Sequence, residues 1–274
     1  MVLIFICIIY LYLYAASKPL IVDIVNTVNL KLLLVFFIFS TTSMAQNESF
    51  LGLCLGAALP QGVYAEQDFY TEGAGYANTG FLFTFDGAVF PDEYLGFGMT
   101  VSYGSNNPNK TKYKEDLIKD VLDRYPELEE ILEDQIYFDY GTWRYLNIHA
   151  GPAFTIPVGN FNFDLRGLAG LTLAWAPQQQ FQITWDEDKS FSRVVEDKAI
   201  PTLGFTIGTG VRYSFKSGFV LRFIAEYSNS KPTIEVTEDI LESIVDGSEI
   251  TTHEYEMPIK NIHLGVGIAY NIEL

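Results

Sequence analysis

Seven charged side chains interrupt segments of the chain that are otherwise apolar, small or rich in glycine. Carboxylates and guanidinium groups at such positions can pair with one another, or they can act as acids and bases in catalysis. Within its segment, each charged residue has the opposite sequence parity from the large apolar residues. The seven residues are Asp86, Asp164, Arg166, Arg212, Arg222, Glu226 and Glu273.

The segments that must position these charges are stretches in which apolar residues alternate with small or polar ones. At the end of the chain, every even position from Ile262 to Leu274 is apolar. A period of two predicts an extended strand with two distinct faces. The apolar face is almost free of charge, and Arg144 is its exception. We predict eight such strands, at residues 50–59, 80–90, 93–104, 144–156, 160–175, 201–215, 218–227 and 261–274.

The connections between these strands alternate in length. Short links rich in turn-forming residues follow the second, fourth and sixth strands, whereas residues 60–76, 105–136, 176–200 and 229–257 form long links. Short periplasmic turns and long extracellular loops are typical of outer-membrane barrels. The pattern therefore predicts an all-β fold: an eight-stranded antiparallel up-and-down transmembrane β-barrel with short helices in its extracellular loops. A soluble lipocalin-like barrel also has eight strands, but that fold does not require this segregation.

Charge is distributed unevenly over this plan. The net charge of −17 argues against a nucleic-acid partner, because phosphate contacts require Lys and Arg. The four long links hold 25 acidic and nine basic residues. Because we assign these links to the extracellular side, most of the negative charge should lie on the outer surface. We expect outer-membrane lipid and lipopolysaccharide to surround the wall, with an extracellular or envelope protein as a further partner through the loops. We expect a monomer, and no sequence motif indicates a metal or a cofactor.

Two apolar runs precede the first strand. Residues 30–45 resemble a secretory signal peptide, with Lys31 before an apolar core and the small residues Ser43 and Ala45 at its end. We predict that residues 1–29 are an upstream extension and that translation starts near Leu30. The mature barrel would then cover residues 46–274, and N-terminal sequencing that begins at Gln46 would support this cleavage.

The inward face of an eight-stranded barrel determines what fills its lumen. Such a barrel is just wide enough for side chains, so the seven charged residues should form a buried ion network rather than line a pore. Arg212 and Arg222 should lie opposite one another across the turn at Ser217, where Asp164 and Glu273 could compensate them. Removing one partner should cost more than removing both. A catalytic cluster is the alternative interpretation.

Two of the long links carry helical patterns. In residues 112–134, Leu117 and Val121 lie on one apolar stripe, and in residues 237–247 Ile240 and Ile244 do the same. Thr237 is suited to cap the second helix, and Gly247 is suited to end it. Such stripes either pack on their own loops or bind a partner.

Four segments resemble those of a known family. The signal ending "SMAQ", "RYLNIHAGPAF" (144–154), "FDLRGLAGL" (163–171) and the terminal "YNIEL" are similar to the PorT-like outer-membrane β-barrel domain family over about residues 46–274. The resemblance implies a small barrel of the OmpA/OmpX type in the bacterial outer membrane. One member takes part in a secretion system, but the family name does not transfer that role. Leu274 departs from the Phe that ends many such barrels.

These observations favour a non-enzymatic closed barrel that displays acidic loops for structural or interaction roles. One alternative is a lipid-modifying enzyme, such as a lipid A deacylase or palmitoyltransferase, which needs a Ser–His pair. His149 and His263 have inward parity, His253 lies in a loop, and none belongs to a His-x-Ser motif. Two further hypotheses are a secretion-system accessory barrel and a cation site at residues 186–188 or 237–242.

Overall fold

The computed structural model describes residues 49–71, 73–124, 126, 136–186, 189–243 and 247–272. The chain divides into two units, Met1–Met44 and Ala45–Leu274, and all described residues belong to the second. The predicted extension (1–29), the predicted signal peptide (30–45), Ile244 and Glu273 therefore lie outside the described residues. Within the described residues, no helix is both long and apolar enough to span a membrane.

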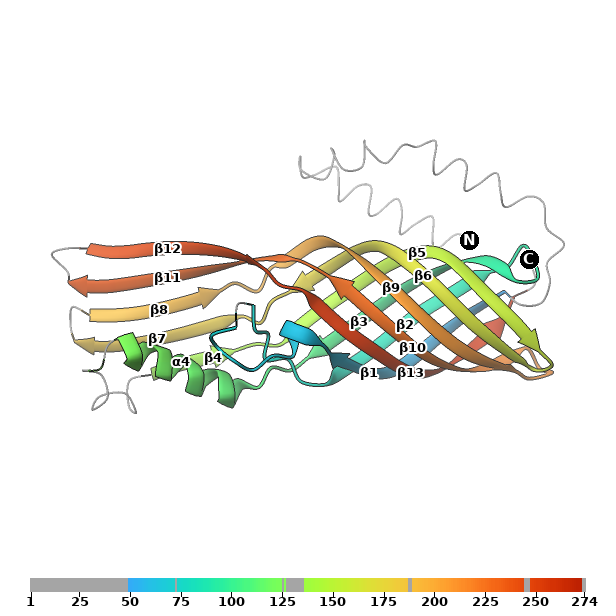
Figure 1. Ribbon diagram of the computed structural model, residues 1–274, viewed down its shortest axis with the longest axis horizontal. Helices are drawn as coiled ribbons and strands as arrows, with labels where there is room; N and C mark the ends of the chain where they lie inside the picture. The colour runs from blue at the N-terminus through green and yellow to red at the C-terminus, as the bar shows by residue number, and fades with distance from the viewer. Residues whose placement is uncertain are drawn as a thin grey trace, which may run out of the picture. The chain divides into compact units, whose positions relative to one another are not determined.

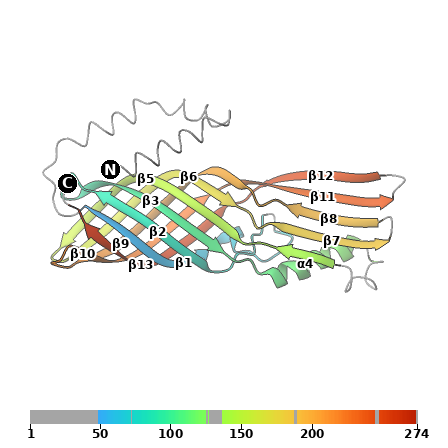
Figure 2. The ribbon, with the colours of Figure 1, turned by 180° about the vertical axis from the view of Figure 1, so that it is seen from behind.

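Eight strands form a closed antiparallel barrel in which each strand pairs with its neighbours along the chain (Figures 1 and 2). Pairing of the first strand with the last closes the barrel. All eight predicted strands are confirmed, with ends shifted by a few residues. The barrel strands are β1 (Phe50–Pro60), β2 (Gly80–Val89), β3 (Leu95–Asn106), β5 (Trp143–Val158), β6 (Phe161–Trp175), β9 (Ala199–Ser214), β10 (Phe219–Ser230) and β13 (Ile259–Asn271).

Short turns join the barrel strands at one end. Gly159 and Gly218 have φ of 63° and 84°, in the left-handed region that glycine enters without steric cost. The predicted tight links after the second, fourth and sixth strands are present, because only a few residues separate β2 from β3, β5 from β6 and β9 from β10. At this end the amide of Ile272 donates a 2.8 Å hydrogen bond to the carbonyl of Ser49, so the two ends of the barrel segment meet here.

At the opposite end, ribbons from the barrel continue into a second sheet of five strands (Figure 1). Its order, β12-β11-β8-β7-β4, repeats that of the barrel strands β13-β10-β9-β6-β5 that the ribbons join. The prediction that residues 176–200 and 229–257 form loops was wrong, because hairpins with alternating β-branched and aromatic residues occupy most of them. The strands are β4 (Ile136–Tyr140), β7 (Gln179–Asp186), β8 (Lys189–Val195), β11 (Thr233–Ser243) and β12 (Gly247–Glu256).

Helices occupy only part of the predicted positions. The first predicted loop helix, in residues 112–134, is confirmed in its first half as α4 (Lys110–Arg124), and residues 127–134 lie outside the described residues. A 3-10 helix, η2, spans Gly62–Tyr64. The second was wrong: Ile240 lies on strand β11, opposite Glu249 of β12 and Phe191 of β8. Pairing on both sides satisfies the backbone groups of β11, and this outweighs a helical stripe whose Ile, Val and Thr residues equally suit a strand.

We call the five-stranded sheet, α4 and residues 61–79 the outer cap. One apolar cluster, which includes Tyr64, Trp143, Tyr145 and Met257, lies where the cap joins the barrel. A second cluster joins α4 to the sheet, and Leu117 and Val121 are fully buried in it. These two residues therefore pack on their own cap, which is the first of the two outcomes that the sequence left open for this stripe.

Candidate functional site

The lumen of the barrel collects the charged residues that the sequence singles out. Inward glycines make room for them: a Cβ on Gly208 would collide with Glu226, and one on Gly104 would collide with the ring of Tyr145. Alternation of tiny and large inward residues therefore lets long side chains cross the narrow barrel.

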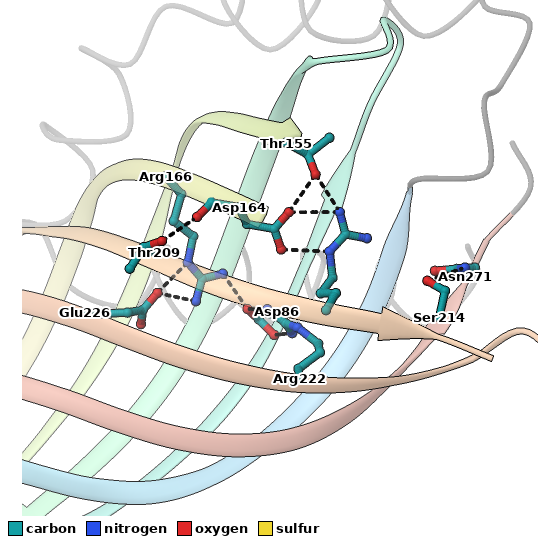
Figure 3. A network of polar contacts seen from close by, with 10 residues as sticks. Asp86, Thr155, Asp164, Arg166, Thr209, Ser214, Arg222, Glu226 and Asn271 are labelled. Carbon is teal, nitrogen blue, oxygen red and sulfur yellow. Dashed lines mark hydrogen bonds and ion pairs between the residues drawn. The ribbon is translucent and has the colours of Figure 1, made fainter. Parts of the chain in front are cut away.

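Asp86 is the centre of one ion network (Figure 3). Its carboxylate accepts hydrogen bonds from Arg166 and from both terminal nitrogens of Arg222, one of them at 2.9 Å. Arg166 reaches Glu226 on its other side. All four side chains are buried, and Asp86 is only 1% exposed. Buried charges are tolerated when they are paired in this way, whereas an unpaired one is very costly.

A second pair lies beside this network. Arg212 Nε and Nη2 donate to the two oxygens of Asp164, over 2.7 Å and 2.9 Å. The hydroxyl of Thr155 donates to Asp164 over 2.8 Å (Figure 3). This bidentate geometry is the strong form of an arginine–carboxylate contact. It joins β5, β6 and β9 inside the lumen.

Arg212 and Arg222 are direct partners in the β9–β10 register, as the sequence predicts. Each turns to a different carboxylate, and both guanidinium carbons lie 4.3 Å from the centre of the Phe50 ring. Asp164 pairs with Arg212 as expected, whereas Asp86 on β2 is the partner of Arg222. Sequence reasoning recognised the inward position of Asp86 but could not assign this partner, because the contact depends on how strands distant in sequence face each other across the lumen.

Neutral polar residues fill the part of the lumen nearer the cap. The two ring nitrogens of His149 lie 3.0 Å and 3.1 Å from the hydroxyls of Thr206 and Thr172. His263 Nε2 lies 2.8 Å from the hydroxyl of Tyr145. Both histidines are at most 1% exposed, and their ring nitrogens lie within hydrogen-bonding distance of threonine or tyrosine hydroxyls. This arrangement gives no support to the Ser–His enzyme alternative.

The lumen is packed rather than open. Near the short turns, an apolar cluster that contains Phe50, Phe90 and Val220 closes it, and the cluster around Trp143 lies at the other end. A cavity of about 20 Å³ beside Arg166 and Arg222 has room for about one water molecule. Among the described residues, no group of three or more His, Cys, Asp or Glu side chains could hold a metal ion. Residues 187–188 of one proposed cation site lie outside that part of the chain.

Comparison with known proteins found no matching family model and no matching curated protein, so the PorT-like resemblance gains no support there. Several solved structures are similar. They include a major outer membrane protein from Thermus thermophilus, with 10% identity over 82% of this chain and 99% of that one, at a TM-score of 0.42. Ail of Yersinia pestis has 14% identity over 81% and 99%, at 0.38, and the outer membrane protein AlkL has 13% over 86% and 94%, at 0.34. The fold assignment therefore stands on the strand pairing of this chain itself.

Proposed function

We propose that this chain is an integral barrel of the bacterial outer membrane, with its short turns in the periplasm and its outer cap outside the cell. The observation that carries the proposal is a reversal of polarity along single ribbons. In β10 the outward side chains Phe219 and Phe223 are each 55% exposed, while Arg222 and Glu226 are buried in the lumen. In β11, which follows at once, Ile234 and Val236 are buried.

This reversal has a direct physical interpretation. In β11 the exposed positions are Thr233 and Glu235, as expected for a sheet in water. Exposed apolar rows such as that of β10 recur on all barrel strands, and soluble monomers rarely expose apolar patches beyond a few hundred Å². A wall that is apolar outside and polar inside suits acyl chains around it. The reversal supports a change of solvent at the boundary between barrel and cap.

Ion pairs on the outer surface lie at the same boundary. Arg144 Nη2 lies 2.5 Å and 2.7 Å from the two carboxylate oxygens of Asp197, and its guanidinium also lies over the ring of Trp175. Lys198 pairs with Glu235, and Lys231 pairs with Glu256. Charged and aromatic side chains of this kind are favoured at the membrane–water interface. Arg144 thus occupies a position where a cation on the lipid-facing parity is tolerated.

The role we propose is non-enzymatic: a closed barrel that holds an acidic cap at the cell surface. A plugged lumen and the threonine and tyrosine partners of the two lumenal histidines support this role. The lipid around the wall, including lipopolysaccharide, is the proposed partner, and a protein partner would meet the outer surface of the cap. Membership of the PorT-like family is part of the same proposal, and the quoted segments alone support it.

Cell fractionation combined with heat-modifiability tests this proposal. The protein should enter the outer-membrane fraction and need detergent for extraction. Unboiled samples should migrate faster on a denaturing gel than boiled ones, because a folded barrel stays compact. Recovery of the mature chain as a folded monomer in buffer without detergent would contradict the proposal. A deletion strain with altered lipid A mass spectra would instead point to the enzyme alternative.

A further inference from the structure

A cavity of about 250 Å³ lies in the outer cap, among residues 69–71 and 73–76, helix α4, and strands β4, β5, β7, β8 and β12. It is separate from the lumenal network. Aromatic rings form most of its lining, those of Phe69, Tyr76, Tyr113, Tyr140, Trp143 and Tyr255. The four from Tyr76 to Trp143 are buried, and the other two are half-buried. The cavity therefore has a buried aromatic floor and a partly exposed rim.

Contacts within the protein itself hold the aromatic floor in place, so its position does not depend on a bound ligand. Tyr76 has φ of 52°, a left-handed conformation that is uncommon for a bulky residue. Its backbone amide donates to Glu66, its carbonyl accepts from Asn109, and its hydroxyl donates to Asp116 over 2.8 Å. The ring of Tyr113 stacks on that of Tyr140, with centroids 4.5 Å apart. Residues held in sparsely populated conformations are concentrated at functional sites, which makes this one a candidate.

Several residues of the lining carry hydrogen-bonding groups. The hydroxyl of Tyr113 donates a 2.8 Å hydrogen bond to Gln179 Oε1. The amide nitrogen of Gln179 can then donate to a ligand. Burial raises the pKa of Tyr255 to about 12 and raises the pKa of Tyr140 well above its ordinary value. Both hydroxyls therefore keep their protons at neutral pH, when they can donate as well as accept.

The charge around the cavity disfavours an ionic ligand. Among the described residues of the lining, the charged one is Arg193, and its guanidinium lies 6.0 Å from the ring centre of Phe69. In the strand register, Glu238 of β11 lies directly opposite Arg193 of β8. A cation would meet the guanidinium in the wall, and an anion would have to enter a cap whose links are strongly acidic. A neutral ligand meets neither penalty.

We propose that this cavity binds a single neutral sugar ring, either as a free monosaccharide or as the terminal residue of a glycan. The apolar face of such a ring can pack on the tyrosine and tryptophan rings, while its hydroxyls bond the tyrosine hydroxyls, Gln179 and Arg193. An apolar hydrocarbon of equal size could pack on the rings, but it could not bond the hydroxyls of Tyr140 and Tyr255 or the amide nitrogen of Gln179. The cavity is also smaller than the roughly 300–1,000 Å³ of pockets for drug-sized ligands, which suits a single ring.

Saturation-transfer NMR on the refolded mature protein in lipid nanodiscs tests this proposal. The probes are glucose, galactose, mannose and N-acetylglucosamine, each as the free sugar and as its methyl glycoside. At least one should receive saturation in its ring protons. Equal binding of the methyl glycoside would identify a glycan terminus as an acceptable source, and binding of the free form alone would identify the monosaccharide.

Conservative variants test whether the sugar binds in this cavity. Tyr140→Phe combined with Tyr255→Phe keeps both rings and removes two hydroxyls, so the dissociation constant should rise at least tenfold. Tyr255→Phe alone, at the rim, should raise it about two- to tenfold, and it serves as the test if the double variant does not fold. The matched control is Tyr137→Phe, an exposed tyrosine of β4 outside the lining, which should change nothing.

Three results would overturn the proposal: no transfer to any of the four sugars, transfer that is equal in wild type and double variant, or transfer to benzoate or choline but not to the sugars. Heat-modifiability measured on the same sample shows independently whether the barrel is folded. A heat-modifiable protein that binds no sugar therefore refutes the site and leaves the proposed function standing.

Discussion

The barrel wall and the outer cap share the same ribbons but bury opposite kinds of side chain. Within the barrel, the ribbon of β10 and β11 turns Arg222 and Glu226 inward, and within the cap it turns Ile234 and Val236 inward. The ribbon of β6 and β7 behaves alike, with Thr172 buried in the barrel and Phe181 buried in the cap. Extended structure alone therefore does not determine which face is buried. The proposed change from lipid to water along the ribbon accounts for the difference.

The two regions are also held together by different forces. Ion pairs between strands distant in sequence, such as that of Asp86 with Arg222, order the lumen. Apolar and aromatic packing around Leu117 orders the cap, as in a water-soluble domain. Substitutions in the two regions should therefore destabilise different parts of the protein.

Asp86→Ala should have the largest effect. It leaves the guanidinium groups of Arg166 and Arg222 without their shared carboxylate, and breaking a buried pair costs roughly 3–5 kcal/mol. Urea titration of the refolded barrel in detergent, followed by gel mobility, measures the loss. Unchanged stability would mean that the network does not hold the lumen.

Leu117→Ala should destabilise the cap while sparing the barrel. Truncation of a fully buried Leu costs roughly 2–5 kcal/mol. Limited proteolysis should then cut α4 faster, while the heat-modifiable core remains resistant. Equal loss of barrel stability would show that the two regions unfold as one unit.

Ile207→Lys and Ile250→Lys compare two isoleucines that are similarly exposed, at 56% in the barrel and 65% in the cap. Lipid around the wall makes a mid-bilayer Lys cost roughly 2–4 kcal/mol, so the first variant should refold poorly into liposomes. The second should refold like wild type, because its side chain already meets water. Equal tolerance of both would remove the distinction between the two exposed faces.

Asp197→Ala should have the smallest effect. Its side chain is 40% exposed, and surface ion pairs contribute only about 0–1 kcal/mol. The same urea titration as for Asp86→Ala measures it. A loss as large as that of Asp86→Ala would mean that the boundary pair is shielded from water.

Period-two alternation allowed the barrel to be predicted from the sequence, including the inward position of Asp164, Arg212 and Arg222. The apolar parity is almost uninterrupted there, and turn residues set the register of each hairpin. The pairing of Asp86 with Arg222 was not predictable, because it requires the closed barrel and the stagger of all its strands.

The cap was predicted less well. Its segments were predicted as loops because they are long links between the alternating strands, and residues 237–247 fit a helical stripe and a strand about equally well. The pairing of Ile240 with β8 and β12 decides in favour of the strand. Such long-range pairing cannot be deduced from the local sequence pattern. Nor did the sequence indicate the aromatic cavity, whose lining comes from α4, from five strands and from residues that precede β2.

Spin labels along one ribbon test the change of solvent most directly. Nitroxides at Phe223 in β10 and Glu235 in β11, both outward and exposed, would be compared in liposomes by their collisions with oxygen and with a water-soluble nickel chelate. The label at 223 should be reached by oxygen and shielded from nickel, and the label at 235 should show the reverse. Equal access of nickel to both positions would contradict a lipid-facing wall.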